Sequence, residues 1–125
     1  MVIQDKKIAT RTDLAALLSI NNTVVILKFG AKWCGPCKFI AKDVNEYMRR
    51  MPADMTCILV DIDESLDLYS YLKTKKVVNG VPVMLAYYAG NLNGCAPDEV
   101  VIGTNMKEIN LFFVKCISKY NQFPK

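Results

Sequence analysis

Three largely apolar stretches, at residues 23–29, 55–60 and 83–88, restrict the possible folds more than any other feature of the sequence. Runs of this length and composition are typical of strands that are buried on both faces of a sheet. Residues 34–50 and 65–75, which lie between them, have the periodicity of helices. A strand–helix–strand connection places the two strands parallel, so we expect a sheet with helices packed on it.

The rest of the chain completes this pattern. Residues 10–18 read as a helix that is capped by Thr10 or Thr12 and ended by Asn21-Asn22, and residues 89–98 read as a hairpin loop. We then expect a short edge strand at 99–102 and a last helix, which begins at the capping box Asn105-x-x-Glu108 and ends at about Tyr120. A further short strand near Val2-Ile3 is possible. The predicted fold class is α/β, with a mixed central sheet flanked by helices on both faces.

Helical spacing also predicts which side chains face the core. In the helix at 65–75 we expect Leu66, Tyr69 and either Tyr71 or Leu72 on the buried side. In the last helix the same spacing selects Ile109, Phe112, Phe113, Cys116, Ile117 and Tyr120. The helix at 34–50 has a buried face formed by Cys37, Ile40, Ala41, Val44, Met48 and Met51.

Composition excludes several classes of protein. The 125 residues fit one domain, 1–125, and 52% hydrophobic with 22% charged residues is typical of a globular chain. The net charge of +4 is spread among acidic residues, which argues against a nucleic-acid surface. No apolar run is long enough to span a membrane and no secretory signal is visible at the start, so we expect no membrane partner and a cytoplasmic protein.

The cysteines point to redox chemistry or to a metal. There are five, an odd number, and two of them, Cys34 and Cys37, have a recognisable spacing. Zinc would need two further ligands, but the chain has no second Cys-x-x-Cys and no histidine. We therefore expect no bound metal and a redox-active pair. The missing histidine also excludes His-dependent catalysis.

The segment Trp33-Cys34-Gly35-Pro36-Cys37 combines a buried strand with a helix start. A helix N-terminus has unpaired N–H groups and the positive end of the dipole, and both favour a thiolate. Cys37 falls on the buried face and Cys34 does not, so we predict that Cys34 is the accessible nucleophile and Cys37 the resolving thiol. Gly35 permits a tight turn and Pro36 suits the first helical turn, while Trp33 is expected as a partly exposed aromatic shelf.

This segment, followed by Lys38, resembles the thioredoxin family, and so does Gly80-Val81-Pro82-Val83 before the third long strand. The resemblance extends from Ile8 to Tyr120 and implies the thioredoxin fold. It also implies a cis Val81–Pro82 bond facing the dithiol, with the Val81 backbone pairing with an extended substrate. Gly103 matches the glycine that lines the family's substrate groove, and the Cys34–Cys37 disulfide would be the only redox group.

Lys28 departs from that family, which usually has a buried acid six residues before the first cysteine. Three interpretations stay open. The amine can reach solvent while its stem packs; as an ammonium it can stabilise a thiolate of Cys34 or Cys37; or as a neutral amine it can accept the thiol proton. The helix also has Lys42 where the family often has a proline, and the loop at 89–98 is longer than usual and is expected far from the dithiol.

The other three cysteines are not expected to take part in the reaction. Cys57 lies in a strand and Cys116 on an apolar helix face, so both are predicted as small core residues. Cys95 lies in the loop at 89–98, where it is either an incidental thiol or a group that links two chains on oxidation.

The sequence therefore predicts a protein-disulfide reductase that acts on other proteins, is recharged by a partner reductase and is a monomer. Reducing members of the family resemble this chain in having Gly-Pro between the cysteines, although Lys28 leaves the oxidising or isomerising direction open. An alternative is a binding or assembly module like the family's relative in the spliceosome. That relative resembles this chain in having a basic residue at the Lys28 position and a Phe-Gly like Phe29-Gly30 here. It differs in lacking the intact dithiol. No peroxidatic Thr-x-x-Cys pattern precedes Cys34.

Overall fold

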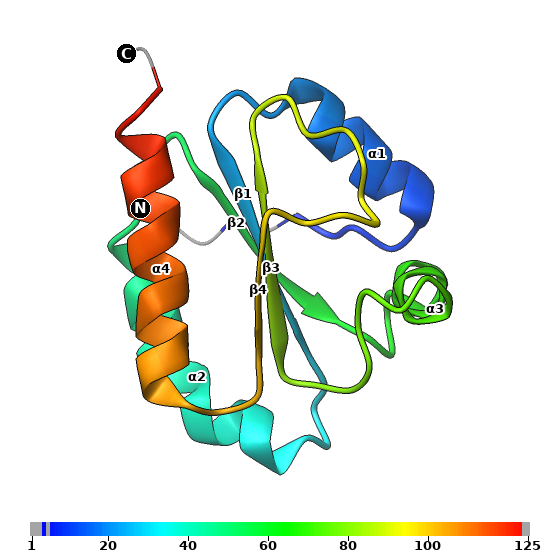
Figure 1. Cartoon of the computed structure of the whole chain (residues 1–125). Helices are drawn as coiled ribbons and strands as arrows, with labels where there is room; N and C mark the ends of the chain where they lie inside the picture. The colour runs from blue at the N-terminus through cyan, green and yellow to red at the C-terminus, as the bar shows by residue number, and fades with distance from the viewer. Residues whose placement is uncertain (1–3, 5, 124–125) are drawn as a thin grey trace.

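The computed structural model describes residue 4 and residues 6–123, and its centre is a four-stranded mixed sheet in the order β2-β1-β3-β4 (Figure 1). The central strand β1 (Val24–Gly30) runs parallel to β2 (Thr56–Asp61) and antiparallel to β3 (Val83–Tyr88). Strand β4 (Glu99–Ile102) is antiparallel to β3 at the edge. The predicted mixed sheet is confirmed.

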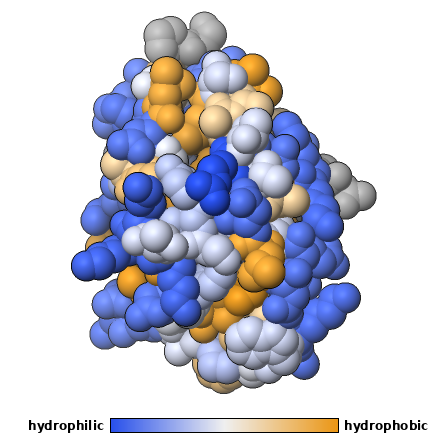
Figure 2. Space-filling view, turned by 90° about the vertical axis from the view of Figure 1, so that its right-hand side faces the viewer, coloured by the Kyte–Doolittle hydropathy of each residue, from blue (hydrophilic) through white to orange (hydrophobic). Residues whose placement is uncertain are grey.

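Two helices cover each face of the sheet. Helices α1 (Arg11–Ile20) and α3 (Leu66–Thr74) lie on one side, and α2 (Gly35–Arg49) and α4 (Met106–Tyr120) lie on the other (Figure 1). The sheet therefore separates two hydrophobic cores. Figure 2 views the side of α1 and α3, where the surface is mostly hydrophilic and apolar areas form separate patches.

Alternation along β1 distributes its side chains between the two cores. Val25, Leu27 and Phe29 pack on the α1–α3 side, whereas Val24 and Ile26 pack on the α2–α4 side. The next residue in the second series is Lys28, so the fold directs a lysine toward the underside of α2.

The helix ends follow the caps in the sequence. Thr10, not Thr12, caps α1, and its side chain forms a reciprocal capping box with Asp13. Asn105 caps α4 by accepting the backbone N–H groups of Lys107 and Glu108. These side chains satisfy N–H groups that have no partner within the helix.

The structure corrects one predicted face and leaves one predicted strand outside its range. Leu66 is 64% exposed, and Leu68 joins Tyr69 and Leu72 in the core instead. The prediction that Leu66 is buried is wrong, because this residue begins the helix and its side chain points away from the sheet. The possible strand at Val2-Ile3 lies outside the described residues, although Gln4 forms an isolated parallel bridge to Ile58. Among the described residues no helix is long and apolar enough to cross a membrane.

Candidate active site

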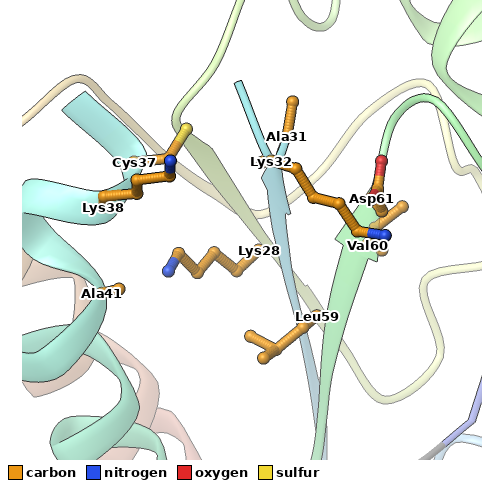
Figure 3. Close-up of a pocket in the computed structure, with 10 residues that line it drawn as sticks. Lys28, Ala31, Lys32, Cys37, Lys38, Ala41, Leu59, Val60 and Asp61 are labelled. Carbon is orange, nitrogen blue, oxygen red and sulfur yellow. The ribbon is translucent and has the colours of Figure 1, made fainter. Parts of the chain in front are cut away.

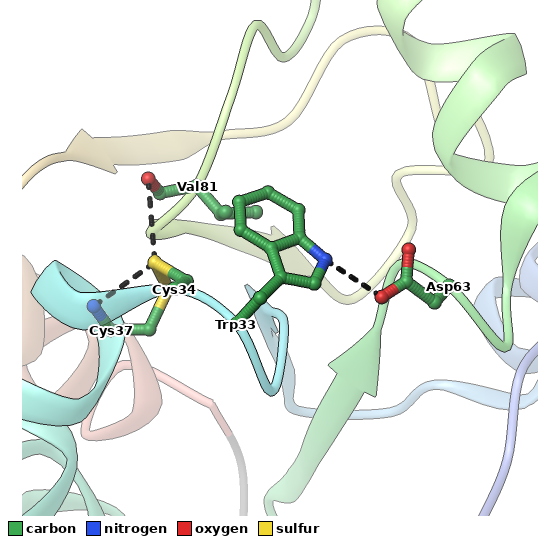
Figure 4. Close-up of a disulfide and its surroundings, with 5 residues drawn as sticks. All are labelled: Trp33, Cys34, Cys37, Asp63 and Val81. Atoms are coloured by element: carbon green, nitrogen blue, oxygen red, sulfur yellow. Dashed lines mark hydrogen bonds between the residues drawn. A yellow bond between two sulfur atoms is a disulfide. The ribbon is translucent and has the colours of Figure 1, made fainter.

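The two cysteines of the motif form a disulfide at the first turn of α2, directly after β1 (Figure 4). Cys34 is the N-cap residue, and its Sγ accepts the backbone N–H of Cys37 at 3.1 Å. The Cα atoms of the two residues are 5.3 Å apart. Pro36 lies within the first turn, where its missing N–H costs no helical hydrogen bond. A negative charge on Cys34 would thus meet a fixed N–H donor and the positive helix end.

The accessibility of the two cysteines differs from the sequence prediction. Cys34 is 4% exposed and Cys37 is 6% exposed, so Cys34 is not the more open residue in the disulfide form. The reason is that an N-cap side chain folds back over the first turn, which brings Cys34 Sγ to the Cys37 N–H and beneath the Val81 carbonyl. Gly35 and Pro36 beside the pair are exposed.

Trp33 forms the exposed aromatic surface that the sequence predicts beside the disulfide. Its side chain is 66% exposed, and the indole Nε1–H donates to Asp63 Oδ2 at 2.8 Å (Figure 4). This bond fixes the orientation of an otherwise free ring. The sequence gives no signal that connects Asp63 with the site, because the contact joins residues 30 positions apart.

A second segment approaches the disulfide from before β3. The Val81–Pro82 peptide bond is cis, as the resemblance implies, and the Val81 carbonyl oxygen lies 3.9 Å from Cys34 Sγ. The Gly103 N–H donates to the Pro82 carbonyl at 3.0 Å, and its φ of 87° favours glycine. The cis Val81–Pro82 segment therefore lies between Cys34 on one side and Gly103 on the other.

Lys28 and Cys37 line the same cavity, which has a volume of about 280 Å³ (Figure 3). Lys28 is 7% exposed, so its stem is packed, and its amine nitrogen is not one of the fully buried polar atoms, which is compatible with the first interpretation. Burial lowers the pKa of the Lys28 amine. Gly30 lies against the disulfide, since a Cβ added there would be 3.6 Å from Cys37 Sγ. Lys28 is two positions earlier on the same face of β1.

The remaining cysteines are placed as the sequence predicts. Cys57 and Cys116 are both fully buried in the α2–α4 core. Burial raises the pKa of Cys57 to about 12 and raises that of Cys116 as well, which disfavours reactive thiolates. Cys95 is half-buried, and its thiol donates to the Tyr71 hydroxyl at 3.1 Å.

Comparisons with known proteins agree on one family. The family model described as Thioredoxin matches residues 6–113. Thioredoxin H-type 2 of Nicotiana tabacum is 35% identical over 72 residues, which cover 49% of this chain and 60% of that protein. Thioredoxin of Mycoplasmoides gallisepticum is 30% identical over 87 residues, which cover 70% of this chain and 81% of that protein. The chain thus spans about 60% of the length of the first relative.

Solved structures show the same architecture. The structure of Plasmodium falciparum thioredoxin has a TM-score of 0.63 and 26% identity, and the match covers 88% of this chain and 97% of that one. Mitochondrial thioredoxin 3 of Saccharomyces cerevisiae, in its oxidised form, has a TM-score of 0.69 and 23% identity, with coverage of 88% and 93%. The second likeness concerns the fold alone.

Proposed function

The chain belongs to the thioredoxin family, and from this premise we propose that it is a thiol–disulfide oxidoreductase that reduces disulfides in other proteins. The observation that carries the proposal is the Cys34–Cys37 disulfide at the N-terminus of α2, with Cys34 Sγ accepting the Cys37 N–H. A dithiol in this position can pass two electrons to a substrate and close into the disulfide that the structure contains. In this proposal the cysteine pair is the redox-active group of the protein, and no other cofactor or metal takes part.

The first step is attack by the Cys34 thiolate on one sulfur of a substrate disulfide. The substrate S–S bond breaks, a mixed disulfide forms, and one substrate sulfur leaves as a thiolate. The Cys37 N–H and the helix dipole favour the thiolate of Cys34 before attack. Val81, whose carbonyl lies beside Cys34 Sγ, offers its backbone to an extended substrate segment, and Gly103 and Trp33 flank the approach.

The second step releases the substrate. The Cys37 thiolate attacks Cys34 Sγ, the mixed disulfide breaks, and the second substrate sulfur leaves as a thiolate that takes up a proton. The protein is now oxidised by two electrons, and a thiol-containing reductase must return them. The 5.3 Å between the two Cα atoms allows this closure within one helical turn.

Reduction of insulin by dithiothreitol in the presence of the protein tests the proposal. We expect the protein to accelerate insulin precipitation above the rate of the reagent alone. Cys34→Ser should abolish the acceleration, Cys37→Ser should accumulate a mixed disulfide with insulin, and the matched control Cys95→Ser should behave as wild type. A rate equal to that of the reagent would contradict the proposal and favour the binding module.

The direction of electron flow needs its own measurement. Lys28, near Cys37, favours a thiolate when charged and thus favours the dithiol form, which is the property of oxidising members. Equilibration of the Cys34–Cys37 pair with glutathione buffers gives its potential. A potential near the roughly −270 mV of reducing thioredoxins supports the reductase, whereas one near the roughly −120 mV of strong oxidants contradicts it.

The partners and place of action follow from the same proposal. We propose disulfide-containing proteins as substrates, a separate reductase as electron source, a monomeric protein and a cytoplasmic location. The relatives include proteins named as chloroplastic, so imaging of the tagged full-length protein is the direct test of location.

A further inference from the structure

The Lys28 amine has an unusual environment. Lys28 is 7% exposed, no hydrogen bond or ion pair joins its amine to another residue within residues 4 and 6–123, and the amine nitrogen is not one of the fully buried polar atoms there, so it keeps contact with solvent. An ammonium that is solvated only by water, on a stem that packs among other side chains, can bind an anion through a charge-assisted hydrogen bond. Because the amine faces a cavity, an anion from outside the chain can reach it.

The cavity is suited to one class of anion. In Figure 3, Lys28 extends from β1 across the cavity toward Ala41 on α2. Apolar side chains form much of the lining, and Lys32 and Lys38 add two positive charges against the single carboxylate of Asp61. The lining is Lys28, Gly30, Ala31, Lys32, Cys37, Lys38, Ala41, Leu59, Val60 and Asp61.

Charge and apolar surface together indicate a ligand with both properties. The formal charge of the lining, three lysines against one aspartate, attracts an anion. An inorganic anion would leave the apolar wall exposed to water, whereas an alkyl carboxylate would cover it. The cavity of about 280 Å³ is larger than the roughly 150 Å³ that holds benzene in an engineered protein cavity, so a chain of about six carbons fits.

We propose that this cavity binds a small aliphatic carboxylate, with the carboxylate on Lys28 and the alkyl group against Leu59 and Ala41. Lys28 and Leu59 are register partners on β1 and β2, so the charged and apolar contacts lie side by side on one face. The proposal does not depend on dithiol chemistry, and it is tested in the oxidised protein without any turnover.

The experiment titrates the oxidised full-length protein at pH 7 with sodium hexanoate and follows backbone amide resonances by NMR. We expect saturable shifts at Gly30, Ala41 and Leu59. Hexan-1-ol, which has the same chain without the charge, should bind about tenfold more weakly because it lacks the charge-assisted hydrogen bond. Hexylammonium should not bind. Equal affinity for hexanoate and hexan-1-ol, or no saturable shift, would overturn the proposal.

Two variants assign the site. Lys28→Met removes the amine at similar length and should abolish the preference for hexanoate, while the matched control Lys42→Met, on the exposed side of α2, should retain it. Leu59→Glu places a carboxylate beside Lys28 and should block hexanoate in a folded protein even where Lys28→Met fails to fold. A preference that survives Lys28→Met or Leu59→Glu would disprove the role of Lys28. Insulin reduction by wild type is scored separately, so either proposal can fail alone.

Discussion

A lysine side chain beneath the active-site helix can be charged or neutral, and burial shifts that balance. Desolvation lowers the pKa of Lys28 in the folded protein below the 10.5 of a solvated lysine. Between the folded pKa and 10.5 the unfolded chain therefore binds more protons than the folded one. Stability contributed through this group rises with pH across that window, because the penalty for a buried charge disappears as the amine deprotonates.

Replacement of Lys28 by methionine should reveal this linkage. Methionine fills similar space without a charge, so Lys28→Met should stabilise the oxidised protein at pH 7 by about 1 kcal/mol or less, because the amine of the wild type keeps contact with water. The advantage should shrink as the pH approaches 10, since wild type then also has a neutral side chain. Urea unfolding of both proteins from pH 7 to 10, in buffers without carboxylates, measures the difference. A constant or growing advantage would contradict a buried, titrating amine.

The same substitution should change the ionisation of the active-site thiols in the reduced protein. A protonated Lys28 near Cys37 favours thiolate, so its loss should move the midpoint of thiolate formation to higher pH. Absorbance at about 240 nm, where thiolate absorbs, follows this titration, and Lys42→Met is the control for a general loss of positive charge. An unchanged midpoint and unchanged insulin reduction would leave Lys28 with a packing role alone.

At the scale of elements, the apolar runs and the helical periodicity of the sequence were sufficient to predict the positions of the helices and strands. The bounds of β3 and β4 agree with the sequence prediction, and the other helices and strands differ by one or two residues at their ends. Apolar runs and caps specify these elements locally. The buried face of α3 was less predictable, because a short helix has few turns and the exposed fate of Leu66 depends on how the helix meets the sheet.

The residues of the site that belong to a sequence motif could be predicted from the sequence. The cysteine pair and the cis bond at Pro82 lie where the resemblance implied, whereas the role of Gly103 in a substrate groove stays a prediction. Three features were not accessible to sequence reasoning: the Trp33–Asp63 hydrogen bond, the burial of Cys34 in the disulfide form, and the cavity shared by Lys28 and Cys37. Each depends on the packing of segments that are distant in sequence.

The corrected face of α3 gives a prediction at this scale. Leu68 is fully buried, so Leu68→Ala should lower the free energy of unfolding by about 2 to 5 kcal/mol through lost apolar contacts and a cavity. The matched substitution Leu66→Ala, in the same helix at a residue 64% exposed, should change it by less than about 0.5 kcal/mol. Urea denaturation of the oxidised proteins compares them. Equal losses would contradict the assigned face.

The whole molecule is organised around β1, which separates two cores and leads into the active-site helix. Three segments that are far apart in the chain, at Trp33-Cys34, Val81-Pro82 and Gly103, are joined at one end of the sheet. The one disulfide within residues 4 and 6–123, Cys34–Cys37, closes a loop of a few residues and constrains the unfolded chain little. Stability must therefore come from the two cores, and the α2–α4 core contains residues that report on it.

Cys57 and Cys116 are such reporters, because both lie in the α2–α4 core and are fully buried. In the oxidised native protein we expect a thiol reagent such as Ellman's reagent to label Cys95 first, since it is half-buried in a surface loop. The two core thiols, with raised pKa values, should react only when the molecule opens, so urea should accelerate their labelling in parallel with global unfolding. A Cys95→Ser variant should lose the early phase and keep the slow one. Labelling of Cys57 or Cys116 at the rate of Cys95 would show that this core opens locally, independently of the rest of the sheet.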